Sequence, residues 1–181
     1  MSIKMIAAID KNRAIGYKGK LLFHIPEDME FFRKTTSKKG EDERYKDPMV
    51  IMGRKTYESI GSPLRNRLNV VISSQNNDKD KTIDDIFDIK TVDLYYMRYV
   101  LQMDNLMVKY RPIWIIGGQS IYEQMIDLAD ELYLTLVESV SLDVDSFFPE
   151  YEKDFELAEI ISDGDYKGLK YKITRWIRKE K

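Results

Sequence analysis

The sequence predicts an α/β protein of a single domain, with a mostly parallel central sheet flanked by helices and an antiparallel hairpin at one edge. Three observations support this. Continuous apolar runs, typical of strands buried on both faces, recur along the chain. Segments with helical periodicity separate these runs, which is the order of βαβ units. The length of 181 residues (1–181) suits one domain with a sizeable core.

Five apolar runs predict the strands of the sheet. They are MIAAI at 5–9, PMVIM at 48–52, NVVIS at 69–73, IWII at 113–116 and LYLTLV at 132–137. The first run, followed directly by Asp10, is too short for a membrane span or the core of a signal peptide. We therefore expect a protein that does not bind membranes.

Helices are expected between the strands, at 26–35, 55–60, about 92–103 and 120–128. Pro26 stands at the first position of the first helix, where its missing N–H costs nothing. Thr91 is the expected N-cap of the third helix, whose apolar residues recur at helical spacing.

The C-terminal region predicts a hairpin rather than another βαβ unit. Two apolar runs, at 155–161 and 169–177, flank a stretch rich in turn residues. The turn residues are Asp163, Gly164, Asp165 and Gly168. Arg175 falls among the apolar positions of the second run and fits the alternation poorly.

Composition excludes several classes of function. The net charge of −2 gives no reason to expect binding to nucleic acid. The absence of cysteine excludes disulfides and thiolate metal sites and suits a reducing cytoplasm. His24 is the single histidine, so no histidine metal cluster is expected. The polar stretches 37–47 and 75–81 are predicted to be surface loops.

The first helix places a carboxylate on its apolar face. At helical spacing, Asp28 shares a face with Phe31 and Phe32, whereas Glu27 shares a polar face with Glu30 and Lys34. Acidic residues are favoured in the first turn of any helix because they meet the positive end of its dipole. From the residues alone, Asp28 is therefore either an ordinary first-turn acid or a functional one.

Three predicted strand ends carry groups that suit phosphates. They are Gly117-Gly118 before a helix, Gly53-Arg54-Lys55-Thr56 at another strand-to-helix junction, and Ser73-Ser74. Ligands of open parallel sheets bind at these strand ends. The pattern indicates a dinucleotide, and adjacent Arg54 and Lys55 favour NADP over NAD. Scattered structural turns are an equally open explanation.

Seven segments, in order and over nearly the whole chain, resemble the dihydrofolate reductase family. They are AAIDKNRAIG at 7–16, IPEDMEFFRKTT at 25–36, VIMGRKTYESIGSPLRNR at 50–67, NVVISS at 69–74, IIGGQSIYEQ at 115–124, LYLT at 132–135 and DSFFPEY at 145–151. The resemblance implies a dihydrofolate reductase-like fold over residues 1–181.

The resemblance also implies a substrate pocket. Asp28 would bind the pteridine ring with Thr135 beside it, and both are the expected catalytic residues. Arg67 would pair with the α-carboxylate of the folate glutamate. The expected apolar walls are Ile6, Ala8, Met29, Phe32, Ile60, Leu64 and Ile116.

The same resemblance implies an NADPH site. Gly117 and Gly118 would be joined by a cis peptide, and residues 14–20 would form a mobile loop over the nicotinamide. The expected cofactor-binding residues are Ala8, Ala14, Ile15, Gly16, Tyr17, Gly19, Lys20, Gly53, Arg54, Lys55, Thr56, Ser73, Ser74, Gly117, Gly118, Gln119, Ser120, Ile121 and Tyr122.

The resemblance therefore implies an enzyme that reduces 7,8-dihydrofolate with NADPH. We expect a cytoplasmic protein, monomeric rather than oligomeric, without a metal. Two alternatives stay open: the NADPH-dependent reductase of riboflavin biosynthesis, and a folate- or nucleotide-binding module without catalysis. The riboflavin enzyme lacks the pocket Asp and the Arg for the glutamate tail.

Overall fold

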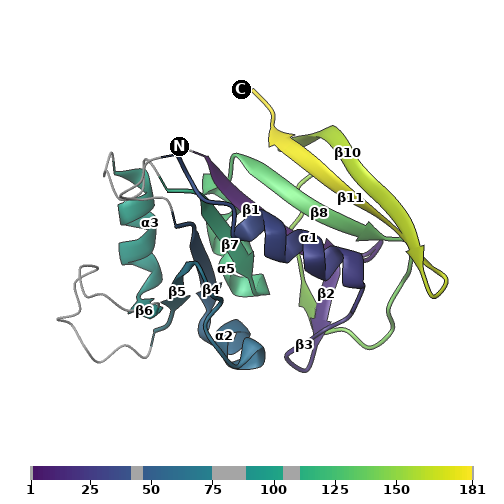
Figure 1. Ribbon diagram of the computed structural model, residues 1–181, viewed down its shortest axis with the longest axis horizontal. Helices are drawn as coiled ribbons and strands as arrows, with labels where there is room; N and C mark the ends of the chain where they lie inside the picture. The colour runs from purple at the N-terminus through teal and green to yellow at the C-terminus, as the bar shows by residue number, and fades with distance from the viewer. Residues whose placement is uncertain (1, 42–46, 75–88, 104–110, 181) are drawn as a thin grey trace.

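A computed structural model describes residues 2–41, 47–74, 89–103 and 111–180 (Figure 1). Within these residues, eight strands form the main sheet in the order β10-β11-β8-β1-β7-β4-β5-β6. The strands are β1 (Ile3–Ile9), β4 (Met49–Gly53), β5 (Leu68–Ile72), β6 (Ile89–Val92), β7 (Ile113–Gly117), β8 (Glu131–Val137), β10 (Phe155–Tyr166) and β11 (Leu169–Arg178).

The predicted fold class is confirmed. The six strands from β8 to β6 run parallel to one another. β11 then pairs antiparallel with β8, and β10 pairs antiparallel with β11 at the edge of the sheet. All five predicted parallel strands are present, and β6 is an addition that the apolar pattern did not predict.

Helices cover both faces of the sheet. They are α1 (Pro26–Thr36), α2 (Arg54–Ile60), α3 (Leu94–Gln102) and α5 (Gln119–Met125), which continues into the 3₁₀ turn η1 (Ile126–Leu128). The prediction that Thr91 caps the third helix was wrong, because Thr91 lies in β6. Asp93 is the N-cap, and its side chain accepts a hydrogen bond from the Tyr96 amide at 2.8 Å.

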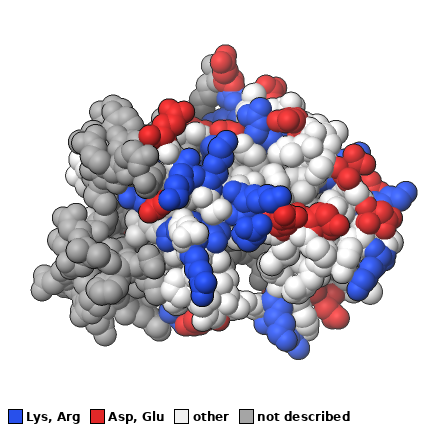
Figure 2. Space-filling view, viewed as in Figure 1, with Lys and Arg blue, Asp and Glu red and all other residues white. Residues whose placement is uncertain are grey.

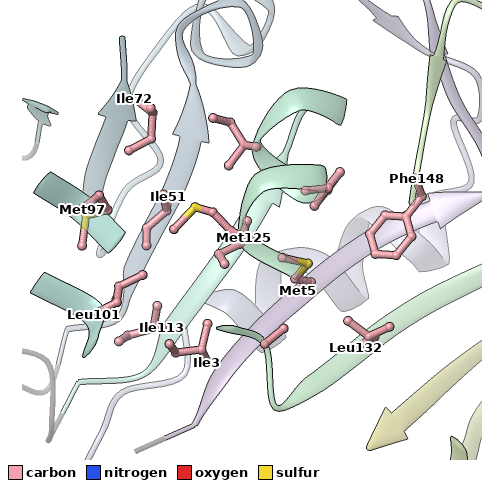
Figure 3. Close-up of a cluster of buried hydrophobic side chains, with 14 of the residues drawn as sticks. Ile3, Met5, Ile51, Ile72, Met97, Leu101, Ile113, Met125, Leu132 and Phe148 are labelled. Carbon is pink, nitrogen blue, oxygen red and sulfur yellow. The ribbon is translucent and has the colours of Figure 1, made fainter. Parts of the chain in front are cut away.

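The continuous apolar runs are buried on both faces, as predicted. On one face, alternate strand residues such as Met5 and Ile51 pack against Met97 and Leu101 of α3 and Met125 of α5 (Figure 3). The intervening strand residues form a second cluster, which packs against α1 and α2. It contains Ile6, Val50, Met52, Val71, Trp114 and Ile116.

The hairpin was predicted correctly, but its turn lies further along the chain. Asp163, Gly164 and Asp165 continue β10, and the chain reverses at Lys167 and Gly168. Both of these residues have positive φ, as a two-residue hairpin turn requires. Arg175 is half-buried in β11. Its guanidinium forms ion pairs with the carboxylates of Glu131 and Glu159, which compensate its charge at this position.

A second, small sheet lies beside the main one, in the order β3-β2-β9. It comprises β2 (Ala14–Tyr17), β3 (Lys20–Leu21) and β9 (Ser146–Phe147). Periodicity did not predict these strands, because two to four residues are too few to show alternation.

The polar stretch 75–81 lies outside the described residues, as do residues 42–46 of the other predicted loop. Among the helices of the described ranges, none has the length and apolarity needed to cross a membrane.

Candidate active site

A deep cleft opens at the carboxyl ends of the parallel strands. Its volume is about 1580 Å³, whereas a site for one small ligand typically has roughly 300–1,000 Å³. The cleft therefore has room for two ligands at once. Most predicted site residues line it: Ile6, Ala8, Ile15, Gly16, Gly19, Lys20, Asp28, Met29, Phe32, Gly53, Arg54, Lys55, Thr56, Ile60, Leu64, Ser73, Ser74, Ile116, Gly118, Gln119, Ser120, Ile121 and Tyr122.

Asp28 lies in the first turn of α1 and lines the cleft. Thr135 of β8 stands beside Ala8 of β1 and is buried behind the carboxylate. Its Oγ1 donates a hydrogen bond to Asp28 Oδ1 at 2.5 Å. This bond orients the carboxylate, which can then accept hydrogen bonds from adjacent N–H groups of a planar ligand.

Burial raises the pKa of Asp28 above its ordinary value, and the hydrogen bond from Thr135 offsets part of that rise. Within the described part of the chain, no Lys or Arg acts on the pKa of this carboxyl. Asp28 is therefore a desolvated acid without a charge partner, which is typical of functional sites.

Apolar side chains line the cleft together with Asp28. Ile6, Phe32, Leu64 and Ile116 contribute to the cleft wall and belong to the cluster between the sheet and α1. Met29 and Ile60 also line the cleft, although 45% of Met29 and 38% of Ile60 remain exposed to solvent. A flat ligand seated over Asp28 would cover this apolar surface.

Arg67 lies outside the main cleft but lines a depression that continues from it. The depression shares Met29, Phe32 and Leu64 with the cleft wall. Arg67 is buried as a residue, and its guanidinium donates hydrogen bonds to Thr36 Oγ1 at 2.8 Å and to the Arg65 carbonyl at 3.0 Å.

Burial and the nearby Arg33 lower the pKa of Arg67. Lys and Arg side chains also gather near the middle of the face in Figure 2, where α1 crosses in Figure 1. No carboxylate among the described residues pairs with Arg67. The depression therefore suits a carboxylate of a ligand.

The glycines at the ends of β4 and β7 allow close packing around a second half of the cleft, distinct from the half that contains Asp28. The peptide bond between Gly117 and Gly118 is cis, as the resemblance implied. Gly117 has a φ of 105°, and a Cβ atom there would lie 2.8 Å from the Tyr122 ring. A Cβ atom at Gly118 would lie 3.2 Å from Thr56 Oγ1. Only glycine fits this junction without displacing its neighbours.

Cationic and hydroxyl side chains line the same half. Arg54, Lys55 and Thr56 begin α2, and Ser73 and Ser74 follow β5. Arg54 forms an ion pair with Glu58 at 2.5 Å, which an incoming anion would have to displace. Among the described residues, no group of three or more His, Asp or Glu is placed to hold a metal ion.

The segment predicted as a loop over the nicotinamide forms β2, β3 and the turn between them, and several of its residues line the cleft. The turn meets α2, where Ser59 Oγ donates to the Gly19 carbonyl at 2.7 Å. Asp145 Oδ2 accepts a hydrogen bond from the Lys18 amide at 2.8 Å. The β2–β3 hairpin thus borders the cleft, and hydrogen bonds connect its turn to α2 and to Asp145.

Five predicted residues do not line the main cleft: Ala14, Tyr17, Arg67, Gly117 and Thr135. Ala14 and Gly117 are buried, Thr135 acts through Asp28, and Arg67 lines the depression. Tyr17 is half-buried, and its alternation with Gly16 along β2 places it on the other face of that strand.

Lys18 was not predicted individually, although it falls within the predicted loop at 14–20. Sequence reasoning missed several other residues of the cleft: Ala7, Leu21, Leu22, Phe23, His24, Ser59, Ile72, Asp93, Leu94, Tyr95, Glu123, Gln124, Asp145 and Ser146. Most of them belong to short strands and helix ends whose tertiary placement the sequence pattern does not encode. Asp145 begins the DSFFPEY segment, so that segment was a signal that could have identified it.

These features define an α/β enzyme fold whose cleft joins a carboxylate-based pocket to a phosphate-compatible one. The family model described as dihydrofolate reductase matches residues 2–178. A protein from Staphylococcus aureus named dihydrofolate reductase is 33% identical over 162 residues, covering 89% of this chain and 87% of that protein. One of the same name from Buchnera aphidicola is 34% identical over 152 residues, covering 84% and 80%.

The chain belongs to the dihydrofolate reductase family and is an oxidoreductase.

Proposed function

We propose that the chain catalyses the NADPH-dependent reduction of 7,8-dihydrofolate to 5,6,7,8-tetrahydrofolate, with hydride added to C6 and a proton to N5. The reaction would support one-carbon and thymidylate metabolism. We place it in the cytoplasm, where a chain without cysteine is at no disadvantage. The proposed active unit is a monomer, because one chain supplies both halves of the cleft.

One observation carries the proposal, namely the Asp28 carboxylate, which Thr135 orients in a cleft that also has apolar wall residues. A pteridine ring presents its 2-amino group and N3 side by side, and two carboxylate oxygens match such a pair of donors. Met29 and Ile60 would cover the flat ring, and Arg67 would bind the glutamate carboxylate in the adjoining depression.

The other half of the cleft fits NADPH. Gly53, Gly117 and Gly118 leave no room for a Cβ atom, so Ile121, Tyr122 and Thr56 can pack closely at the strand ends that border the proposed cofactor site. Arg54 and Lys55 would bind the extra monoester phosphate, and Thr56, Ser73 and Ser74 would add hydroxyl donors. NADPH would supply the hydride when bound.

The protein residues would supply alignment and electrostatics. An imine accepts hydride faster when it is protonated, so the site must favour a proton at N5. The negative charge of Asp28 beneath the ring would raise the basicity of N5, while the apolar walls exclude water that would screen this charge. Thr135 would keep the carboxylate in the required orientation.

The test is an assay of purified protein with NADPH and dihydrofolate, followed by the loss of reduced-nicotinamide absorbance. Asp28→Asn should lower turnover by about a hundredfold or more, because a neutral amide no longer raises the basicity of N5. Binding of NADPH should remain, since Asp28 is not among the residues proposed to bind the cofactor.

Near-normal turnover by Asp28→Asn would assign the chemistry to another residue. Oxidation of NADPH only with a pyrimidine ribosyl substrate would overturn the proposed substrate, and binding of both ligands without turnover would overturn the proposed catalysis. Glu27→Gln is the matched control, because Glu27 is the exposed neighbour of Asp28 in the same helical turn.

A further inference from the structure

Gln119 is the first residue of α5 and directly follows the glycine pair. It lines the cleft with its neighbours, and its side chain is half-buried. Unlike the glycines before it, Gln119 carries a side chain that reaches a different part of the fold.

The Gln119 amide is held by two partners at once. Its Oε1 accepts a hydrogen bond from the Phe147 amide at 2.8 Å, and its Nε2 donates one to Glu123 Oε1 at 2.7 Å. A carboxylate only accepts and a backbone N–H only donates, so this pair of partners fixes which end of the amide faces which way. Glu123, one turn along α5, thus aims Gln119 at Phe147.

Phe147 connects this contact to the border of the cleft. It lies in β9, an edge strand of the small sheet, where it pairs with Ala14 of β2. The Asp145 amide donates to the Gly16 carbonyl at 3.1 Å, and the Phe148 amide donates to the Arg13 carbonyl at 2.7 Å. β9 therefore holds β2, and through it the β2–β3 hairpin, by backbone hydrogen bonds.

We propose that Gln119 is a positioning residue whose side-chain amide fixes the β3-β2-β9 sheet against the glycine pair, so that the hairpin is held in place beside the bound cofactor. This role rests on the proposed function, because it assigns the cofactor to the glycine half of the cleft. Gly16, Lys18, Gly19 and Lys20 of the hairpin all line the cleft, so a displaced hairpin would change the shape of the proposed cofactor site.

The first test is amide hydrogen exchange on the free protein. Gln119→Ala removes the acceptor at Phe147, so exchange at Phe147 and along β2 should accelerate about threefold to tenfold. Gln124→Ala is the matched control, because Gln124 lies on the same helix and, among the described residues, its side-chain amide donates only to Ser120 of α5. Equal exchange in wild type and Gln119→Ala would overturn the proposal.

The second test exchanges the two partners on α5. Gln119→Glu keeps an acceptor for the Phe147 amide but places two carboxylates together, so the dissociation constant for NADPH should rise about threefold to tenfold. Adding Glu123→Gln restores the donor–acceptor pair with the wild-type net charge, and the constant should return to within about twofold of wild type. The KM for dihydrofolate should stay unchanged throughout.

If the double variant binds NADPH as weakly as Gln119→Glu does, the positioning role is overturned. The negative charge at position 119, and not the hydrogen-bond geometry, would then explain the loss of NADPH affinity. Failure of the proposed function gives a different result, namely wild-type protein that does not oxidise NADPH with dihydrofolate. The hydrogen-exchange result on the free protein does not depend on that activity.

Discussion

At the scale of the residue, a single hydrogen bond from Thr135 adjusts the pKa of the Asp28 carboxyl in the cleft. Burial raises the pKa of Asp28, and the Thr135 hydroxyl opposes this by donating to the ionised form. The helical face of Asp28 could be derived from the residues alone, whereas Thr135 as its partner could be predicted only from the family resemblance. Thr135 lies 107 residues away in the chain, and only the sheet brings the two together.

The first prediction at this scale concerns the pH dependence of the hydride step. Asp28 and N5 titrate as a coupled pair, and the hydride step needs one proton on this pair. The rate should therefore fall about tenfold per pH unit once the pH exceeds the apparent pKa of the pair. Thr135→Val removes the donor that lowers the pKa of Asp28. The falling limb should therefore move to higher pH.

The measurement is a pH profile of the hydride step by single-turnover kinetics with deuterated NADPH. Thr135→Ser retains a hydroxyl and should keep the wild-type profile. A limb that stays in place in Thr135→Val, or moves to lower pH, would contradict this assignment.

The second prediction concerns stability. Because the pKa of Asp28 is raised in the folded state, its ionisation opposes folding at pH values above its folded pKa, and this effect disappears below its unfolded pKa. Asp28→Asn should therefore raise Tm near neutral pH by about 2–4 °C, the change expected for about 1 kcal/mol in a domain of this size. The gain should vanish as pH falls below about 3.9.

Thermal denaturation from pH 3 to 8 measures this effect, and Asp127→Asn provides a control of opposite sign. The hydrogen bond from Arg98 lowers the pKa of Asp127, so neutralising Asp127 should not stabilise the protein at any pH. A lower Tm for Asp28→Asn at neutral pH would contradict the assigned environment of Asp28.

At the scale of the element, strands buried on both faces could be predicted best. A run such as IWII can be identified as a strand without knowing its neighbours in the sheet, because continuous apolar residues already imply burial on both faces. The small sheet could not be predicted, since β9 exists only because the Asp145 and Phe148 amides meet the backbone of residues 13–16. Pairings of that kind depend on tertiary placement.

The third prediction concerns the junction between β7 and α5. Gly117→Ala would place a Cβ atom 2.8 Å from the Tyr122 ring at a φ of 105°. The ring is itself fixed, because Tyr122 Oη donates to the Ile6 carbonyl at 2.7 Å. Backbone strain of about 1–3 kcal/mol adds to this steric conflict, so Tm should fall by about 5 °C or more and NADPH should bind more weakly.

Gly168→Ala separates the backbone effect from the steric one. Gly168 also has a positive φ of 83°, but a Cβ atom there would contact nothing within 4 Å. Thermal denaturation and NADPH titration of both variants test the prediction. We expect Gly168→Ala to lower Tm less and to leave NADPH affinity unchanged, and equal losses in the two variants would refute the steric explanation.

At the scale of the molecule, the sheet separates two packed faces, and the cleft opens at the carboxyl ends of its parallel strands. Phosphate-compatible strand ends could be predicted from the residues, because parallel strands place their carboxyl ends together. The extent of the cleft could not be predicted, since residues such as Ser59 and Tyr95 join it only through the placement of α2 and α3.

The last prediction follows from the size of this cleft. Its two halves use different residues within about 1580 Å³, so NADPH and a folate should bind together and not compete. A ligand at a hundredfold excess over its dissociation constant stabilises the folded state by about 2.7 kcal/mol. Each ligand alone should therefore raise Tm, and the two together should raise it by at least the sum of the separate shifts.

Folic acid is a suitable second ligand at short incubation, with oxidation of NADPH monitored to confirm that both ligands persist. Asp28→Asn should reduce the shift produced by folic acid and keep the one produced by NADPH. If the shift with both ligands equals the larger single shift, the two ligands share one site, and the division of the cleft into two halves is wrong.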